Sequence, residues 1–227
     1  MRILDLNDWP RRPLFELFRG YTQPDFNVTA TVDVTALRAL VRERQVSFMV
    51  ASTYVLARAA NEFTPLRWRI RGDQVVEHDV VHPSVTDADA QGDLFHFCAL
   101  PYHRSGPEFL RGAREALKVS AGQPSVATTP GQDARLYLSS LPWLHFTSIQ
   151  HPQHLSPPDS IPRLTTGKYV EQGGRWQMPL SVQVNHALMD GLHVAQYFAR
   201  VQALLDDPGL LDAPSPAQHP ERPLSTS

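Results

Sequence analysis

Residues 180–193 read LSVQVNHALMDGLH, and this stretch decides the fold. Leu180–Val184 is apolar at alternate positions, which predicts a strand. The run that follows, Val194–Leu205, has the apolar spacing of a helix. His186 therefore stands at the end of a strand and Asp190 near the start of a helix. A strand end, a turn and a packed helix fix an imidazole in place, as a general base requires.

Length and composition indicate one folded unit without a charged partner. The chain has 227 residues, 42% of them hydrophobic, and a net charge of −2. A core can form at this length, and the absence of a basic stripe argues against nucleic acid as a partner. We expect a single domain over residues 1–211 and a disordered Pro- and Ser-rich tail over residues 212–227.

The ends of the chain and its one cysteine point to an ordinary intracellular protein. The N-terminus carries early acidic residues and lacks the apolar core of a signal peptide. No apolar run approaches the length of a membrane span, so we expect a cytoplasmic protein without a membrane partner. Cys98 is the single cysteine, which excludes an internal disulfide. Its apolar neighbours predict a buried strand residue and not a nucleophile.

The remaining pattern predicts many strands with helices between them. Helices are expected at residues 9–18, with Asp8 as N-cap, and at 35–42, 48–62, 107–119 and 194–205. Strands are expected at residues 26–34, 66–70, 74–78, 84–86, 95–100, 136–139, 143–147, 164–169 and 176–184. This order predicts an α/β (or α+β) fold, a two-layer sandwich in which helices cover a mixed β-sheet.

Four segments, in order along the chain, carry a family resemblance. They are Trp9–Arg12 with Phe15, Ser139–Trp143, Thr165–Tyr169, and His186-x-x-x-Asp190-Gly191. The last motif alone also occurs in dihydrolipoamide acyltransferases and in condensation domains of peptide synthetases. Together the four segments resemble type A chloramphenicol acetyltransferases over roughly residues 3 to 205.

The resemblance implies a fold, an activity and an assembly. It implies a chloramphenicol acetyltransferase-like sandwich that forms a homotrimer with active sites at subunit interfaces. Acetyl-CoA would be the co-substrate, with no bound cofactor, and a hydroxyl of chloramphenicol would be the acceptor. The activity would confer resistance to the antibiotic.

His186 and Ser139 are the residues to which the resemblance assigns the chemistry. His186 matches the family's general base, which is typically worth about 10²–10⁴-fold in rate. By itself it would read as a core histidine satisfied by a carbonyl. Ser139 matches the serine that stabilises the tetrahedral oxyanion, worth roughly 10²–10³-fold in kcat. By itself it would read as an ordinary strand-end serine.

Three further residues are expected to shape the site. The resemblance pairs Asp190 with Arg11, although Arg12 could take that place if the alignment shifts by one residue. Asp190 could instead, or in addition, cap the last helix. Thr165 matches a threonine that holds an ordered water near the reaction intermediate.

The substrate-binding residues also follow from the resemblance. Lys168 and Tyr169 match residues near the CoA nucleotide, where a cation suits phosphate and an aromatic face suits adenine. They would otherwise read as a solvated strand pair, or Tyr169 as core.

On the acceptor side the chain departs from the family. Leu17 and Phe18 stand where the family has two aromatics, the second often tyrosine. His151 replaces an apolar residue, whereas Phe95 keeps its aromatic match. These changes leave acetyl transfer in place and put the acceptor in question.

Other chemistries lack their motifs. His186, Asp190 and His193 are not completed by further ligands into a zinc set, so no metal is expected. There is no G-x-S-x-G elbow, no G-x-G-x-x-G and no Walker-type loop. The open alternatives are a CoA-dependent acyltransferase for another small alcohol or thiol, a dihydrolipoamide acyltransferase core without its lipoyl domain, and a non-catalytic binder of a hydrophobic ligand.

Overall fold

The computed structural model describes residues 1–88, 94–122, 131–154 and 159–212. Its main helices are α1 (Arg12–Phe18), α2 (Thr35–Arg44), α3 (Phe48–Glu62), α4 (Gly106–Gly122) and α5 (Gly191–Asp206). Short 3-10 turns lie at Thr64–Arg67 and Pro208–Leu211. The predicted tail lies outside the described residues apart from Asp212.

Two sheets are present in the described part of the chain. The strands are β1 (Arg2–Ile3), β2 (Asp25–Asp33), β3 (Trp68–Arg71), β4 (Gln74–Glu77), β5 (His82–Ala88), β6 (Phe95–Ala99), β7 (Arg135–Leu141), β8 (Arg163–Gly167), β9 (Val170–Gln172) and β10 (Arg175–Asn185). The larger sheet has the order β2-β10-β8-β7-β5-β6, with β9 paired to β10, and the smaller has the order β1-β4-β3. The larger sheet is mixed, because β5, β7 and β8 run parallel and the other pairs are antiparallel.

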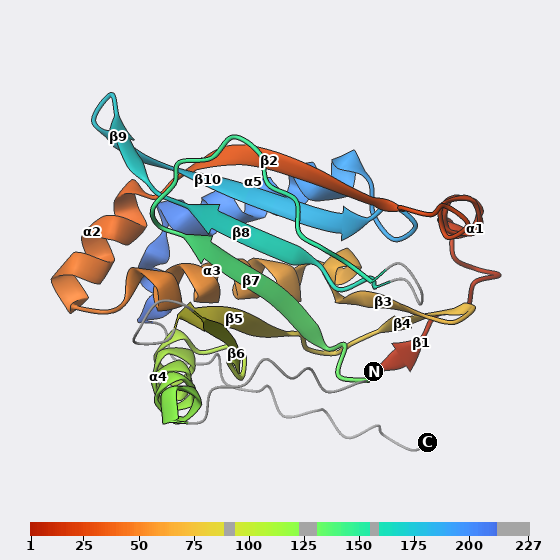
Figure 1. Ribbon diagram of the computed structural model, residues 1–227, viewed down its shortest axis with the longest axis horizontal. Helices are drawn as coiled ribbons and strands as arrows, with labels where there is room; N and C mark the ends of the chain where they lie inside the picture. The colour runs from red at the N-terminus through yellow and green to blue at the C-terminus, as the bar shows by residue number, and fades with distance from the viewer. Residues whose placement is uncertain (89–93, 123–130, 155–158, 213–227) are drawn as a thin grey trace, which may run out of the picture.

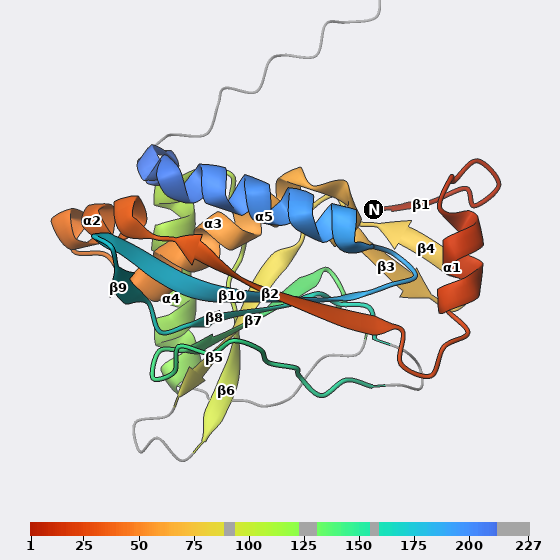
Figure 2. The same ribbon diagram turned by 90° about the horizontal axis from the view of Figure 1, so that it is seen from above.

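The two faces of the larger sheet differ in chemistry. In β10, Leu180, Val182 and Val184 belong to the hydrophobic core, whereas the alternate residues Ser181 and Gln183 are polar. Helices α2, α3 and α5 lie on one side of the sheet, and the segment at residues 142–154 crosses the other (Figure 1, Figure 2). The apolar face therefore packs under the helices, and the polar face lies under an irregular segment.

The irregular segment covers the polar face and forms hydrogen bonds with its side chains. Asn27 Nδ2 donates to the carbonyl of Ile149 at 2.7 Å, and Ser181 Oγ donates to Asn27 Oδ1 at 2.6 Å. Backbone groups of a covering segment and amide side chains of the sheet thus satisfy each other, which is what allows polar residues to be buried.

The predicted fold class, a mixed sheet covered by helices, is confirmed. Cys98 is a buried strand residue, also as predicted. Two local predictions are wrong. The first helix begins at Arg12, and its N-cap residue is Arg11, so Asp8 does not cap it.

The second wrong prediction is the strand at residues 143–147. After Pro142 the chain turns across the end of β8, where Lys168 N donates to the Leu144 carbonyl at 2.9 Å. A Cβ on Gly167 would stand only 2.8 Å from that carbonyl oxygen and 2.9 Å from the Phe146 ring. The segment crosses the strand at close range, and so it does not pair beside it.

Candidate active site

His186 is held at the end of β10 by its own backbone and by two rings. Its backbone N–H donates to the Pro24 carbonyl at 2.8 Å. Its ring stacks on Phe18, with ring centroids 4.0 Å apart and an interplanar angle of 5°, and Phe26 lies at 4.7 Å. These contacts leave the imidazole in one orientation, half-buried between aromatic neighbours.

A carbonyl selects the tautomer of this imidazole. Nδ1 of His186 lies 3.0 Å from the Met189 carbonyl oxygen, which can only accept, so the proton is on Nδ1. Nε2 then carries the lone pair, and in the described part of the chain it has no hydrogen-bond partner. This nitrogen can accept a proton, as a general base must.

The turn after the strand owes its shape to Asn185. The Asn185 carbonyl accepts hydrogen bonds from the backbone of Leu188 and Met189, and its Oδ1 accepts from Ala187 N at 3.0 Å. Asn185 is buried, so its side chain replaces the water that would otherwise satisfy this turn. The turn brings the Met189 carbonyl back to the His186 ring.

Arg11 ties this turn to α1. Its guanidinium donates to Asp190 Oδ2 at 2.6 Å, to the His186 carbonyl at 2.8 Å and to the Ala187 carbonyl at 3.3 Å. Arg11 is 8% exposed, so these hydrogen bonds replace the ones that water would otherwise make with its guanidinium. The predicted pairing of Arg11 with Asp190 is therefore present. Arg12 instead contacts Glu16 and Asn7 on the surface.

Asp190 performs both of the roles predicted for it. Its Oδ2 binds Arg11, and its Oδ1 caps α5 by accepting from the backbone of Leu192 and His193. The His193 ring completes a capping box, because its Nδ1 accepts from the backbone N–H of Asp190 at 3.3 Å. Burial alone would raise the pKa of the Asp190 carboxyl, but the bonds from Arg11 and His193 outweigh it and hold that pKa well below its usual range.

Ser139 and Thr165 lie side by side on the polar face. Ser139 of β7 is in register with Thr165 of β8, which is in register with Ser181 of β10. The small cavity between α3 and the sheet, which Ser52, Thr53 and Ser140 line, lies on the opposite face, although Ser139 also borders it. Three hydroxyls thus form one row across three strands on the polar face.

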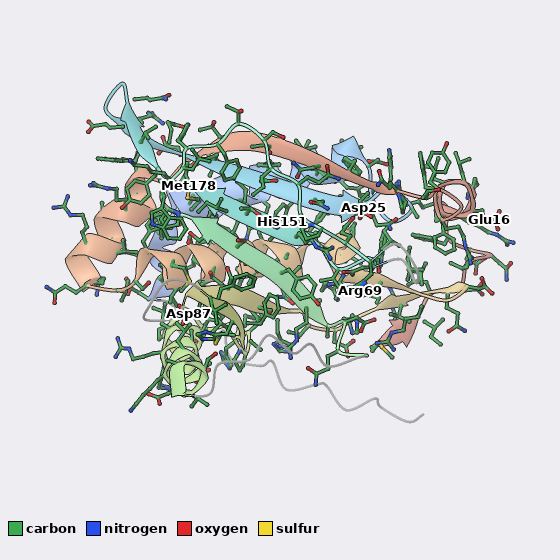
Figure 3. All side chains as sticks on the ribbon, viewed as in Figure 1. Glu16, Asp25, Arg69, Asp87, His151 and Met178 are labelled. Carbon is green, nitrogen blue, oxygen red and sulfur yellow. The ribbon has the colours of Figure 1, made fainter. Side chains whose placement is uncertain are left out.

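His151 reaches this row from the covering segment. Its Nε2 lies 2.6 Å from the Thr165 hydroxyl oxygen. The family resemblance predicted His151 near the acceptor but not its contact with Thr165, because that contact depends on where an irregular segment crosses the sheet. Figure 3 shows His151 over the centre of the sheet, with Asp25 between it and α1.

A single chain does not bring His186 to Ser139. His186 stands five residues beyond Ser181 on β10, which is about 16 Å along a strand, and Ser139 is two strands further across. A base and an oxyanion donor must each lie within about 3 Å of the same small reacting group. The predicted residues therefore form two half-sites in one chain, one around His186 and one around Ser139 and Thr165.

The predicted substrate-binding residues belong to several different parts of the fold. Lys168 is exposed, at the point where the segment after Pro142 passes β8. Tyr169 packs edge-on against Trp176 at 5.5 Å. Leu17 and Phe95 are apolar but 52% and 53% exposed. Phe18 alone of the predicted acceptor contacts touches His186 directly.

Phe26 and Gln183 were not identified from the sequence as parts of the site. Phe26 flanks the His186 ring because β2 pairs with β10, and Gln183 binds the backbone of His151. Their alternation along predicted strands was visible, but the pairing of distant strands was not.

Within the described residues, no three His, Cys, Asp or Glu side chains are grouped as metal ligands would be. No described helix is both long enough and apolar enough to span a membrane.

Comparison with known proteins identifies the family of this chain. The model of the chloramphenicol acetyltransferase family matches residues 1–202. Chloramphenicol acetyltransferase 3 of Escherichia coli is 31% identical over 203 residues, covering 88% of this chain and 94% of that protein. A chloramphenicol acetyltransferase of Proteus mirabilis is 27% identical over 205 residues, covering 90% and 94%.

Solved structures show the same fold. A chloramphenicol acetyltransferase superposes with a TM-score of 0.82 at 27% identity, covering 90% of this chain and 99% of that one. A dihydrolipoamide acetyltransferase from Azotobacter vinelandii, at 18% identity and a TM-score of 0.63, shares the fold. The chain therefore belongs to the chloramphenicol acetyltransferase family of acyltransferases.

Proposed function

We propose that the protein transfers an acetyl group from acetyl-CoA directly to a hydroxyl of chloramphenicol. The observation that carries this proposal is the state of His186, whose Nδ1 is bound to a carbonyl and whose Nε2 is left with a lone pair. The chloramphenicol acetyltransferases named above, which align over nearly the whole chain, support the choice of both substrates.

The reaction needs one base and one oxyanion donor. His186 Nε2 takes the proton of the acceptor hydroxyl while that oxygen bonds to the thioester carbonyl carbon. The tetrahedral intermediate collapses as the carbon–sulfur bond breaks, and the proton on His186 passes to the leaving sulfur. The products are the acetyl ester and CoA with a free thiol, and the imidazole returns to its first state.

Ser139 is proposed as the donor to the oxyanion. Its side chain lies on the polar face, beside Thr165 in the register of β7 and β8. A hydroxyl aimed at the developing negative charge stabilises the transition state more than the substrate. Thr165 would hold a water beside the same intermediate.

Arg11 and Asp190 are proposed as positioning residues for the base. Arg11 binds the carbonyls of His186 and Ala187 and the carboxylate of Asp190, so it fixes the backbone from which the imidazole projects. Neither side chain needs to touch substrate. A displacement of about 1 Å at the base would cost around 10²-fold in rate.

The active site is proposed to form between subunits of a homotrimer. The separation of His186 from Ser139 within one chain supports this, because a second copy can supply the missing half-site. Exposed apolar side chains such as Leu17 and Phe95 suit a pocket that a partner covers. With Phe18 and His151, they are the proposed acceptor contacts.

Lys168 is proposed to bind a phosphate of CoA. It is exposed and follows Thr165 by three residues, so a nucleotide that enters at this edge would meet an ammonium group. Tyr169 supports this role less well, because its ring already packs against Trp176 and Phe48.

The test is a thiol-release assay with acetyl-CoA and chloramphenicol, run on the wild type and on His186→Ala. We expect the variant to lose about 10²–10⁴-fold in kcat, with a circular dichroism spectrum and a Tm close to those of the wild type. His103→Ala is the matched control, because its ring is exposed and pairs with Glu108 of α4 at 2.6 Å.

Two outcomes would redirect the proposal. A folded wild type that gives only the background rate with chloramphenicol would remove this acceptor, and other alcohols and thiols would then be screened. A folded wild type that is inactive in that screen, yet binds an apolar ligand, would favour a binding protein.

A further inference from the structure

Two hydrogen bonds with one side chain hold the backbone of His151, although this residue lies in an irregular segment. Its backbone N–H donates to Gln183 Oε1 at 2.9 Å, and Gln183 Nε2 donates back to the His151 carbonyl at 3.3 Å. Gln183 is 1% exposed and lies on β10. A buried glutamine thus holds one residue of the covering segment at two points, which sets the position of the imidazole over β8.

The imidazole is in turn the partner of one hydroxyl. His151 Nε2 lies 2.6 Å from Thr165 Oγ1, and Thr165 is 1% exposed. Thr165 shares its row with Ser139, the proposed oxyanion donor. The rotamer and the proton direction of a hydroxyl at this place are therefore set by a ring that is itself held by Gln183.

The cation nearest to the ring favours its neutral form. This cation is Arg163, two residues before Thr165 on β8, which pairs with Asp159, and Asp25 on β2 lies within reach of the same guanidinium. The neighbours on β10, Ser181 and Gln183, are uncharged. Burial lowers the pKa of the His151 imidazole, and the positive charge of Arg163 lowers it further.

Asp25 does not reverse this balance. Burial raises the pKa of its carboxyl, against the opposing effects of Gln153 and Arg163. A carboxyl whose charge is disfavoured provides less of the negative potential that would stabilise an imidazolium.

We propose that His151 is a positioning residue of the acyl-transfer site, whose neutral imidazole holds the Thr165 hydroxyl in the orientation that the reaction needs. This inference rests on the proposed function. A neutral Nε2 can accept the hydroxyl proton and leave the lone pairs of Thr165 Oγ1 toward the site. A protonated ring can only donate, which turns the hydroxyl proton away from the ring. Acetyl transfer then requires two neutral imidazoles, His186 and His151.

The pH dependence of kcat separates this role from simple packing. We expect the acid limb of the wild-type profile to contain a protonation that is missing from the profile of His151→Gln, because an amide does not titrate in this range. Glutamine can still bond Thr165, so its kcat at pH 8 should stay within about tenfold of wild type. His151→Leu should lose about 10- to 100-fold in kcat at all pH values, with the KM for acetyl-CoA unchanged.

A double-mutant cycle with Thr165→Val tests the pairing itself. If the two side chains act as one unit, the double variant His151→Leu/Thr165→Val loses no more than the worse single variant. Additive losses would overturn the proposal. The proposal would also be overturned if His151→Leu keeps the wild-type kcat and the wild-type acid limb of the pH profile. A His151→Leu variant that changes only the KM for the acceptor would overturn it as well.

A readout without substrate keeps this inference separate from the proposed function. In labelled protein, the His151 ring signals are assigned by their loss in His151→Gln and followed through a pH titration by NMR. We expect the pKa of His151 to lie below that of an ordinary histidine. This pKa should shift in Thr165→Val. It should not shift in the matched control Thr166→Val, which alters the opposite face of β8. If the pKa of His151 is the same in Thr165→Val as in the wild type, the inference is overturned even if the protein acetylates chloramphenicol. If the pKa of His151 does shift in Thr165→Val but the protein does not acetylate chloramphenicol, the pairing of His151 with Thr165 is supported and the proposed acceptor is wrong.

Discussion

The two half-sites of this chain are built in opposite ways. Around His186, the tautomer and the helix cap come from residues 185–193, and Arg11, the Pro24 carbonyl and two rings join from elsewhere. Around Thr165, each partner comes from a different strand or segment: Ser139, Ser181 and His151. The first arrangement is local and the second exists only through strand register. We therefore expect the two to respond differently to mutation.

The largest expected effect comes from mixing two inactive variants, which tests whether the two half-sites of one active site belong to different subunits. His186→Ala and Ser139→Ala are each nearly inactive as proposed, but co-expressed subunits that mix at random would form sites with both residues intact. About one quarter of sites would then be active in a trimer with interface sites. The measurement is kcat per chain of the mixed sample, with its mass checked by light scattering. A mixed sample as inactive as its parents would place each site within one chain and contradict the interface.

Ser139→Ala is expected to lower kcat by about 10²–10³-fold. Its KM for acetyl-CoA should change little, because the lost bond forms in the transition state. Ser140→Ala is the matched control, since the side chain of the next residue points to the other face of β7. If both variants lose activity equally, the row of hydroxyls is not the oxyanion site.

Asp190→Asn is expected to destabilise the local half-site by about 2 kcal/mol at pH 7, less than for a fully buried pair because the carboxylate is partly exposed. The folded-state pKa of Asp190 is depressed, so its contribution is present above the unfolded pKa of about 4 and is lost as the pH falls below it.

The measurement for this variant is Tm from pH 7 to pH 3, with Asp206→Asn as control at the other end of α5. The gap between Asp190→Asn and wild type should narrow as the pH falls below 4. A gap that stays constant with pH would show that the charge of Asp190 is not what stabilises the turn.

The smallest expected effect concerns the ring that stacks on His186. Phe18→Leu removes an aromatic pair worth about 1 kcal/mol, so kcat should fall about fivefold. Leu17→Ala, one residue earlier and exposed, is expected to leave kcat unchanged and to affect only the KM of the acceptor. Equal losses of kcat in both variants would mean that α1 acts as a whole and not through this stacking contact.

Sequence patterns were strongest where neighbours in the chain are also neighbours in space. Alternation predicted β10, the spacing of apolar residues predicted α3 at its observed bounds, and the His-x-x-x-Asp-Gly motif predicted the junction at Asp190. The strand predicted at residues 143–147 was wrong because composition does not show that a chain crosses a strand instead of pairing with it.

The sequence by itself determined the chemistry available: one imidazole at a strand end, a carboxylate four residues later that caps a helix, and a serine and a threonine on predicted strands. Those choices depend on spacing along the chain and on local hydrogen bonds, which the amino acids specify directly. Only the tertiary structure decided which of these groups meet. Strand order and register put Thr165 beside Ser139 and under His151, and left His186 about 16 Å further along β10. The reason is physical: pairing between distant strands is set by the packing of the whole sheet.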